Sequence, residues 1–174
     1  MLFADVRGYT SLSERLSPVE VTALMNRFYR TASAALLPHD AILGQIAGDQ
    51  VMGLFVPGLA GADYPRRAVA GARALLRAVG YGAPGGNWLD VGAGISSGEE
   101  FVGNVGGGGY KDFTALGDVT NTAARLQAVA RGGEILLDAP TYATVAATYP
   151  EAERHELELK GKQAPVECFR IPAG

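Results

Sequence analysis

Apolar residues recur at helical spacing in four stretches of the chain. The longest begins behind Ser17-Pro18-Val19-Glu20, which has the spacing of a capping box with proline at the first helical position. The apolar pattern that follows predicts an amphipathic helix to about Leu37. The same spacing predicts a second helix over Asp63–Val79, a third over Asp118–Ala130 and a short one over Pro140–Ala147.

Short apolar runs between turn residues predict the strands. These runs are Met1–Val6, Ala41–Ile46, Gln50–Val56, Leu89–Ile95, Glu100–Val105, Tyr110–Leu116, Glu134–Leu137, Glu153–Glu158 and Val166–Ile171. Ala47-Gly48-Asp49 joins the second run to the third as a hairpin. Because helices are mixed with hairpins, the order favours an α+β fold with a mostly antiparallel sheet, and residues 1–174 are expected to form a single domain.

Composition and charge limit the classes of function and location that the chain can have. The chain is 48% hydrophobic and 19% charged, as in ordinary globular proteins, and its net charge of −3 gives no electrostatic case for binding nucleic acid or an anionic membrane. The single cysteine, Cys168, excludes an internal disulfide framework and suits the reducing cytosol, so a cytoplasmic protein is expected. Arg73 and Arg77 interrupt the longest apolar run, so no membrane segment is expected.

Two acidic residues follow or join buried strands. Asp5 ends the first strand, before a glycine turn at Gly8 that leads into a helix, and Asp49 lies at the tip of the predicted hairpin. If the two strands are neighbours, the carboxylates converge, and such hard oxygen ligands suit Mg²⁺ or Mn²⁺. Alternatively, Asp49 is an ordinary turn residue and Asp5 a helix cap.

Two further groups carry polar side chains suited to a nucleotide. Asn121 and Arg125 are four residues apart, on one face of a predicted helix, where an amide and a guanidinium can hold a ribose oxygen and a phosphoryl group. Lys160 and Lys162 flank Gly161 at a turn that suits a terminal phosphate. Each group has a simpler interpretation, a solvated helix face and a polar β-turn respectively.

Taken together and in this order, the motifs resemble the catalytic domain of class III adenylate and guanylate cyclases. The resemblance is carried by Phe3–Ser11, Gly44–Phe55, Gly92–Gly106, Tyr110–Gln127 and Leu159–Val166. It implies a ferredoxin-like, palm-type α+β fold, a head-to-tail homodimer, and active sites in the dimer cleft built from both chains. The glycine-rich stretch up to Leu116 corresponds to the family's dimerisation arm.

The resemblance also assigns roles to individual positions. It implies an enzyme that converts ATP into 3′,5′-cyclic AMP and pyrophosphate, with two Mg²⁺ or Mn²⁺ ions per active site. Asp5 and Asp49 match the metal-binding carboxylates, and Val6 lends its backbone carbonyl to one metal. The transition-state pair matches Asn121 and Arg125 of the other chain. The triphosphate is expected on Lys160 and on the backbone of Val6, Arg7, Gly8, Tyr9 and Thr10.

Base choice in this family rests on two positions, which here are Gln45 and Thr114. Adenylate cyclases commonly carry a lysine at the first and an aspartate or threonine at the second, whereas the guanylate pattern is glutamate and cysteine. A glutamine can donate to adenine N1 or accept from guanine N1–H. ATP is therefore the expected substrate, with weak discrimination against GTP.

Two other functions compete with this prediction. The first is a nucleotide-binding pseudo-cyclase that acts as a sensor or dimerisation module. The second is a palm-type enzyme that joins nucleotides between molecules, which should lack the pair Asn121 and Arg125. A P-loop NTPase is disfavoured because its Gly-x-x-x-x-Gly-Lys-Ser/Thr motif is missing from the sequence. The glycines of Gly103–Gly109 precede no predicted helix, which disfavours a dinucleotide-binding fold.

Overall fold

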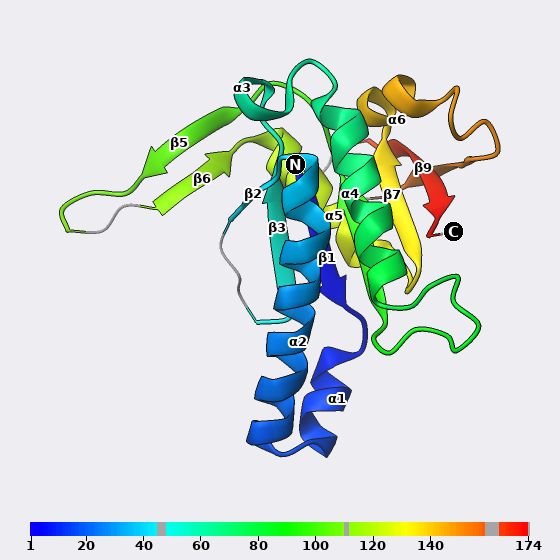
Figure 1. The fold of residues 1–174 in the computed structure, drawn as a ribbon. Coiled ribbons are helices and arrows are strands. Elements are labelled where there is room, and N and C mark those ends of the chain that lie inside the picture. The colour runs from blue at the N-terminus through cyan, green and yellow to red at the C-terminus, as the bar shows by residue number, and fades with distance from the viewer. Residues whose placement is uncertain (45–47, 110–111, 159–163, 174) are drawn as a thin grey trace.

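A seven-stranded β-sheet lies at the centre of the computed structural model, which describes residues 1–44, 48–109, 112–158 and 164–173 (Figure 1). The strand order is β2-β3-β1-β4-β7-β9-β8, and neighbouring strands are antiparallel except β4 and β7, which are parallel. These strands are β1 (Leu2–Val6), β2 (Ile42–Leu43), β3 (Gln50–Leu54), β4 (Val91–Ile95), β7 (Glu134–Asp138), β8 (Glu153–Leu157) and β9 (Val166–Pro172). The predicted α+β fold with a mostly antiparallel sheet is confirmed.

Helices flank this sheet on both faces. They are α1 (Tyr9–Arg15), α2 (Pro18–Leu36), the 3-10 turn η1 (Leu37–His39), α3 (Pro57–Ala60), α4 (Tyr64–Ala78), α5 (Asp118–Val129) and α6 (Ala139–Val145). The capping box predicted for the longest helix is present, since Ser17 accepts from the Glu20 backbone N–H and Glu20 accepts from the Ser17 N–H. No helix among the described residues is long and apolar enough to cross a bilayer.

The main core lies between the sheet and the pair α2 and α4. Side chains alternate along a strand, and Leu2, Ala4 and Val6 of β1 are all buried in this core. Phe28 of α2 and Leu75 of α4 are fully buried against them. Asp5 falls between these positions, so its side chain belongs to the opposite face of the sheet.

That opposite face is covered by α5, which packs directly on β4. Val91, Ala93 and Ile95 point into the main core, which leaves Gly92 and Gly94 facing α5. A Cβ atom at Gly94 would lie 2.2 Å from the Gln127 nitrogen and 2.4 Å from the Ala123 oxygen, and one at Gly92 would lie 2.9 Å from the Ala130 oxygen. The helix backbone therefore rests on the strand backbone because these glycines have no side chain.

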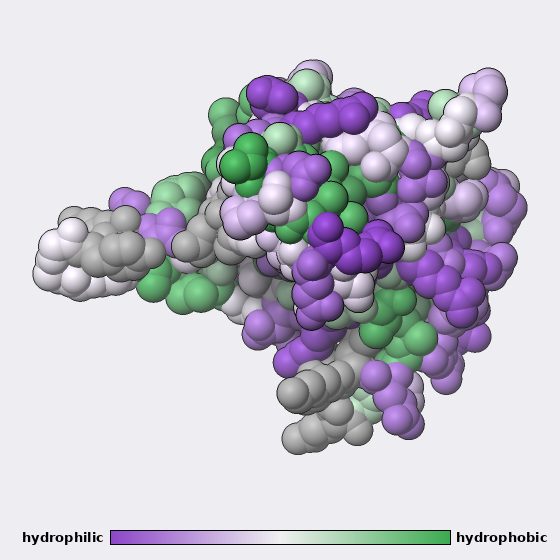
Figure 2. All heavy atoms as spheres, turned by 90° about the horizontal axis from the view of Figure 1, so that it is seen from below, coloured by the Kyte–Doolittle hydropathy of each residue, from purple (hydrophilic) through white to green (hydrophobic). Residues whose placement is uncertain are grey.

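A separate two-stranded arm extends from the body of the molecule (Figures 1 and 2). Its strands are β5 (Phe101–Val105) and β6 (Asp112–Leu116). Three large apolar side chains on it, Phe101, Phe113 and Leu116, are about half exposed. The strands expected before and after Ser96-Ser97-Gly98 both exist, but β5 pairs with β6 and β4 stays in the main sheet.

Two short helices, α1 and α3, follow strands of the main sheet. Helix α1 follows Gly8, whose left-handed φ of 67° turns the chain out of β1, as expected from the glycine. Helix α3 was not predicted, because four residues are too few to establish an apolar period. The strand expected over Ala41–Ile46 is described only as Ile42–Leu43, and its last two residues lie outside the described residues.

We expect Gly94→Ala to destabilise the protein by about 3 kcal/mol, because the added methyl group overlaps the α5 backbone. For a chain of this length that corresponds to a fall in Tm of roughly 10 °C. Circular dichroism against temperature measures it. Gly58→Ala is the matched control, since a Cβ there meets nothing within 4 Å. An unchanged Tm for Gly94→Ala would contradict the close packing of α5 on β4.

Candidate active site

The register of the sheet brings Asp5 and Asp49 together. Strands β1 and β3 are antiparallel, so the end of β1 meets the start of β3, and Asp5 lies opposite Gln50. The Val6 backbone N–H donates to the Asp49 carbonyl oxygen over 3.1 Å. The two acids predicted from sequence as a pair are therefore neighbours at one end of the central strands.

The Asp5 carboxyl is electrostatically unusual. Its pKa is raised to about 6, chiefly because burial disfavours the charged form, and the nearby Asp49 carboxylate raises it further. The Arg7 guanidinium opposes both effects. A shared pair of partly desolvated carboxylates attracts a cation, and the chain already provides one in the Arg7 side chain.

The Arg7 side chain connects the acids to α5. Its Nη2 donates to Asp5 Oδ1 over 2.8 Å, and its Nη1 donates to the backbone oxygens of Gln127 at 3.2 Å and Ala130 at 3.3 Å. The sequence suggested only a backbone role for Arg7. One signal was present, because Arg7 is two residues beyond Asp5 and extended residues at that spacing share a face.

The turn around Asp49 is held from α2. The Tyr29 hydroxyl donates to the Gly48 carbonyl oxygen beside Asp49. Tyr29 was not predicted, because nothing in its spacing separates it from the core residues of α2.

The turn at Gly8 lies at the other side of the site. It is fixed by the Arg7 backbone N–H, which donates to the Asp90 backbone carbonyl oxygen over 2.8 Å. Helix α1 starts directly behind that turn, so the N–H groups of Tyr9 and Thr10 are in its first turn and have no acceptor within the helix.

Helix α5 presents the predicted pair outward. Asn121 is exposed and Arg125 half-buried, whereas Thr122 and Leu126 are buried beneath the helix. Within the part of the chain that the structure describes, the Arg125 guanidinium has no hydrogen bond or ion pair. Nothing in the described part of the chain therefore competes with another group for the Arg125 guanidinium.

Both ends of α5 are fixed by side chains from other elements. At the N-terminal end, Glu100 accepts from the Thr120 N–H over 2.9 Å and from its hydroxyl over 2.8 Å. At the C-terminal end, the Gln50 side-chain amide donates to Gln127 Oε1 over 3.1 Å. Gln50 directly follows Asp49, so α5 is fixed next to both acids.

The predicted base-reading residues are only partly described. Thr114 is half-buried on β6, opposite Gly103 of β5. The ring of Phe101 lies over Gly103, where a Cβ atom would come within 2.9 Å of it. Gln45 and the phosphate-binding candidate Lys160 lie outside the described residues.

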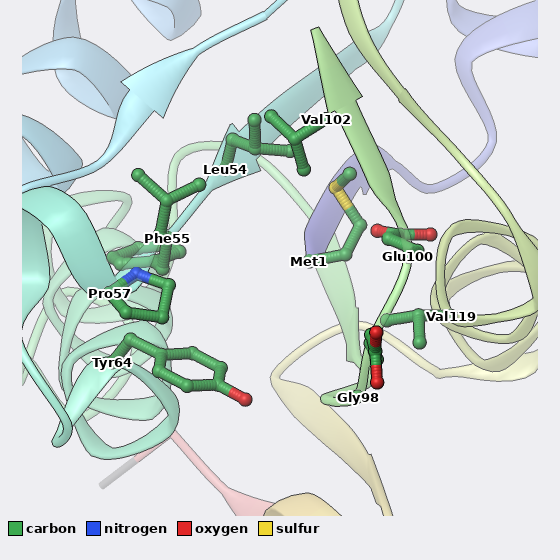
Figure 3. Close-up of a pocket in the computed structure, with 11 residues that line it drawn as sticks. Met1, Leu54, Phe55, Pro57, Tyr64, Gly98, Glu100, Val102 and Val119 are labelled. Atoms are coloured by element: carbon green, nitrogen blue, oxygen red, sulfur yellow. The ribbon is translucent and has the colours of Figure 1, made fainter.

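A cavity of about 340 Å³ lies at the other end of the same strands (Figure 3). Met1, Leu54 and Val102 line it, and the Glu100 carboxylate stands at its edge. Asp5 and Asp49 are not among its lining residues, because they lie at the opposite ends of β1 and β3. This apolar cavity is therefore separate from the acid pair.

The acid pair suits a metal whose shell is completed by other oxygens. Among the described residues no group of three or more His, Cys, Asp and Glu side chains could hold an ion. Two carboxylates and a nearby backbone carbonyl leave positions for water and for phosphate oxygens, which is the usual arrangement for Mg²⁺ at a nucleotide.

Comparison with known proteins identifies the family. The family model described as the adenylate and guanylate cyclase catalytic domain matches residues 1–172. An adenylate cyclase of Anabaena cylindrica is 27% identical over 184 residues, which cover 99% of this chain and 36% of that protein. The chain thus spans about a third of the length of this relative.

Solved structures agree with this result. The adenylyl cyclase CyaB from P. aeruginosa is 29% identical with a TM-score of 0.83, and the match covers 98% of this chain and 91% of that one. The guanylyl cyclase Cya2 is 26% identical with a TM-score of 0.84, covering 98% and 89%. By its sequence along nearly its whole length and by its fold, the chain belongs to the family of adenylate and guanylate cyclase catalytic domains.

Proposed function

We propose that residues 1–174 form one catalytic domain that, as a head-to-tail homodimer, converts ATP into 3′,5′-cyclic AMP and pyrophosphate. The observation that carries this proposal is the convergence of Asp5 and Asp49 at the end of β1, in a chain that belongs to the cyclase family. The outward-facing pair on α5 supports the shared site, because no described side chain of the same chain binds the Arg125 guanidinium.

Asp5, Asp49 and the Val6 carbonyl hold two divalent ions per site, Mg²⁺ or Mn²⁺. Cyclase domains of this family generally use divalent metals, and the two adjacent carboxylates fit such ions. Ions held there would supply a lower pKa for the ribose 3′-hydroxyl and positive charge to neutralise the triphosphate. The backbone N–H groups of Val6 and Arg7 already donate to the Asp49 and Asp90 carbonyl oxygens, so the backbone of Gly8, Tyr9 and Thr10 and the Lys160 ammonium group bind the triphosphate and orient it.

Asn121 and Arg125 of the second chain complete the site. Asn121 orients the ribose, so that its 3′-oxygen faces the α-phosphorus. The bond from this oxygen to phosphorus forms as the bond to pyrophosphate breaks, and the hydroxyl proton passes to Asp5 or to solvent. Arg125 stabilises the negative charge that develops on the α-phosphoryl oxygens.

Gln45 and Thr114 recognise the nucleotide base, and their neutral side chains can each donate or accept a hydrogen bond. This pair favours ATP only modestly, and relatives of both adenylate and guanylate type are consistent with a cyclase of mixed use. A pseudo-cyclase is the alternative function. The complete set of acids, asparagine, arginine and lysine argues against it, since a site kept only as a sensor has no use for the transition-state pair.

Asp49→Ala is expected to lower cyclic AMP formation at least about 100-fold, because it removes one of the two metal carboxylates. Production with ATP and Mn²⁺ is followed by liquid chromatography and mass spectrometry. Asp63→Ala is the matched control, since Asp63 is exposed at the start of α4. Retention of more than about a tenth of wild-type activity by Asp49→Ala would contradict the metal assignment.

Asp49→Ala and Arg125→Ala chains should each be inactive alone and recover activity when mixed. Random pairing makes about half of the dimers mixed, and each mixed dimer has one intact site of two, so roughly a quarter of wild-type activity returns. Mass spectrometry of the intact dimers verifies that subunits exchange. With exchange demonstrated, the absence of recovery would mean that each chain builds its own site.

ATP is expected to be preferred over GTP by about tenfold or less in kcat/KM, equivalent to roughly 1.4 kcal/mol. Products from each nucleotide with Mn²⁺ are identified by mass. Gln45→Lys should sharpen the preference, because an ammonium group only donates and therefore opposes guanine N1–H. Better GTP turnover by Gln45→Lys would refute the role of residue 45, and a thousandfold preference in the wild type would move base recognition elsewhere.

A further inference from the structure

The Arg7 guanidinium binds two different parts of the molecule at once. One side of it contacts the Asp5 carboxylate, with Nη2 to Oδ1 at 2.8 Å. The other side contacts the last turn of α5, with Nη1 at 3.2 Å from the Gln127 oxygen and 3.3 Å from the Ala130 oxygen. Only 22% of the Arg7 side chain is exposed, so these contacts are made largely away from water.

An arginine is suited to this bridge in a way that a lysine is not. The guanidinium is planar, permanently charged and carries five N–H donors in a fixed arrangement, so it can serve a carboxylate and two carbonyls simultaneously. The last carbonyls of a helix lack partners within the helix, and a cation there is favourable. A lysine has one ammonium group at the end of a flexible stem and can satisfy only one of the two sides well.

A second contact between the acid pair and α5 runs parallel to the first. Gln50, next to Asp49, donates to the Gln127 side chain over 3.1 Å. Gln127 itself is 4% exposed and lies two residues beyond Arg125. The same turn of α5 therefore meets the neighbours of both acids, and the position of Arg125 depends on the contacts of that turn.

We propose that Arg7 is a positioning residue that fixes the metal-binding half of one active site and the transition-state half of the other. This inference rests on the shared sites of the proposed function. In such a dimer, Asp5 of a chain serves one site, whereas Asn121 and Arg125 of the same chain serve the second. Arg7 holds Asp5 Oδ1 and leaves the other carboxylate oxygen to the metal, and it also holds the end of α5.

The two contacts predict two separable defects. Loss of the Asp5 contact frees the carboxylate to rotate, and partners that orient a metal ligand typically contribute about 10–100-fold to metal affinity. Loss of the α5 contact displaces Arg125 from the reacting phosphate, which lowers kcat and leaves metal binding unchanged. A residue with only a general structural role would lower stability without this separation.

A dimer with a single working site separates these defects. One chain carries Arg125→Ala and the other carries Asp49→Ala, with different affinity tags, so that only the mixed dimer is purified. The working site then uses Asp5 and Asp49 of the first chain and Asn121 and Arg125 of the second. Arg7→Lys is introduced into either chain. Arg154→Lys is the control, since Arg154 lies on the distant edge strand β8 and has a carboxylate partner of its own, Glu167.

Two measurements are made on each dimer. Turnover of ATP gives kcat, and electron paramagnetic resonance of free Mn²⁺ gives metal affinity in the presence of 3′-deoxy-ATP, which lacks the attacking hydroxyl. Arg7→Lys in the first chain should weaken Mn²⁺ binding about tenfold or more. Arg7→Lys in the second chain should lower kcat about tenfold with Mn²⁺ affinity unchanged, and Arg154→Lys should change neither.

Several results would overturn the inference. Tighter Mn²⁺ binding after Arg7→Lys in the first chain would mean that Arg7 competes with the metal. Equal behaviour of both placements, or no effect of either in an active parent dimer, would remove the bridging role. If the Arg7→Lys dimer does not assemble, Arg7→Gln, which is neutral but keeps N–H donors, takes its place in the same comparisons.

Failure of the proposed function gives a different result. The parent dimer would then form no cyclic nucleotide, whichever residue stands at position 7. Mn²⁺ binding to the first chain, with and without Arg7→Lys, would still report whether this substitution weakens the Asp5 site. An unchanged affinity there would contradict the contact with Asp5 independently of any turnover.

Discussion

The close approach of α5 to β4 is the constraint on which the site depends. Gly92 and Gly94 allow the two backbones to touch, and only at this separation does the end of α5 come within hydrogen-bonding distance of Arg7 and Gln50. The residues on the outer side of the helix are then fixed relative to the sheet. A side chain at Gly94 would push the helix outward and shift Arg125 with it, although Gly94 carries no group that takes part in the chemistry.

Charge compensation makes the acid pair compatible with a folded protein. Two partly buried carboxylates repel each other, and the raised pKa of Asp5 reflects desolvation together with this repulsion. Arg7 supplies a permanent positive charge at 2.8 Å, so the site holds its shape before any cation arrives. The same arginine also donates to the Gln127 and Ala130 carbonyl oxygens at the end of α5, so one partly buried charge binds both the acid pair and the end of the helix.

The sequence was sufficient where local rules decide the structure. The reciprocal bonds of Ser17 and Glu20, the outward position of Asn121 and the proximity of Asp5 to Asp49 follow from spacing, helical period and a hairpin. Strand pairing was harder, because an alternating pattern identifies faces and not neighbours. The sequence pattern did not predict that β5 lies outside the main sheet or that β4 and β7 are parallel. The contacts of Arg7 with α5 link residues 120 or more positions apart, a separation over which no local pattern acts.

The exposed arm has a consequence for how such a domain is controlled. Phe101, Phe113 and Leu116 are about half exposed in a lone chain, and covering them is favourable by roughly 25 cal/mol for each Å² of apolar surface. In the homodimer that we propose, the second chain would cover these side chains and would also complete the active sites. A tether or scaffold that holds two domains close raises their effective concentration without altering any catalytic contact. The rate of cyclic nucleotide formation would then be set by the fraction of domains that are dimeric, and therefore by how closely the domains are held together.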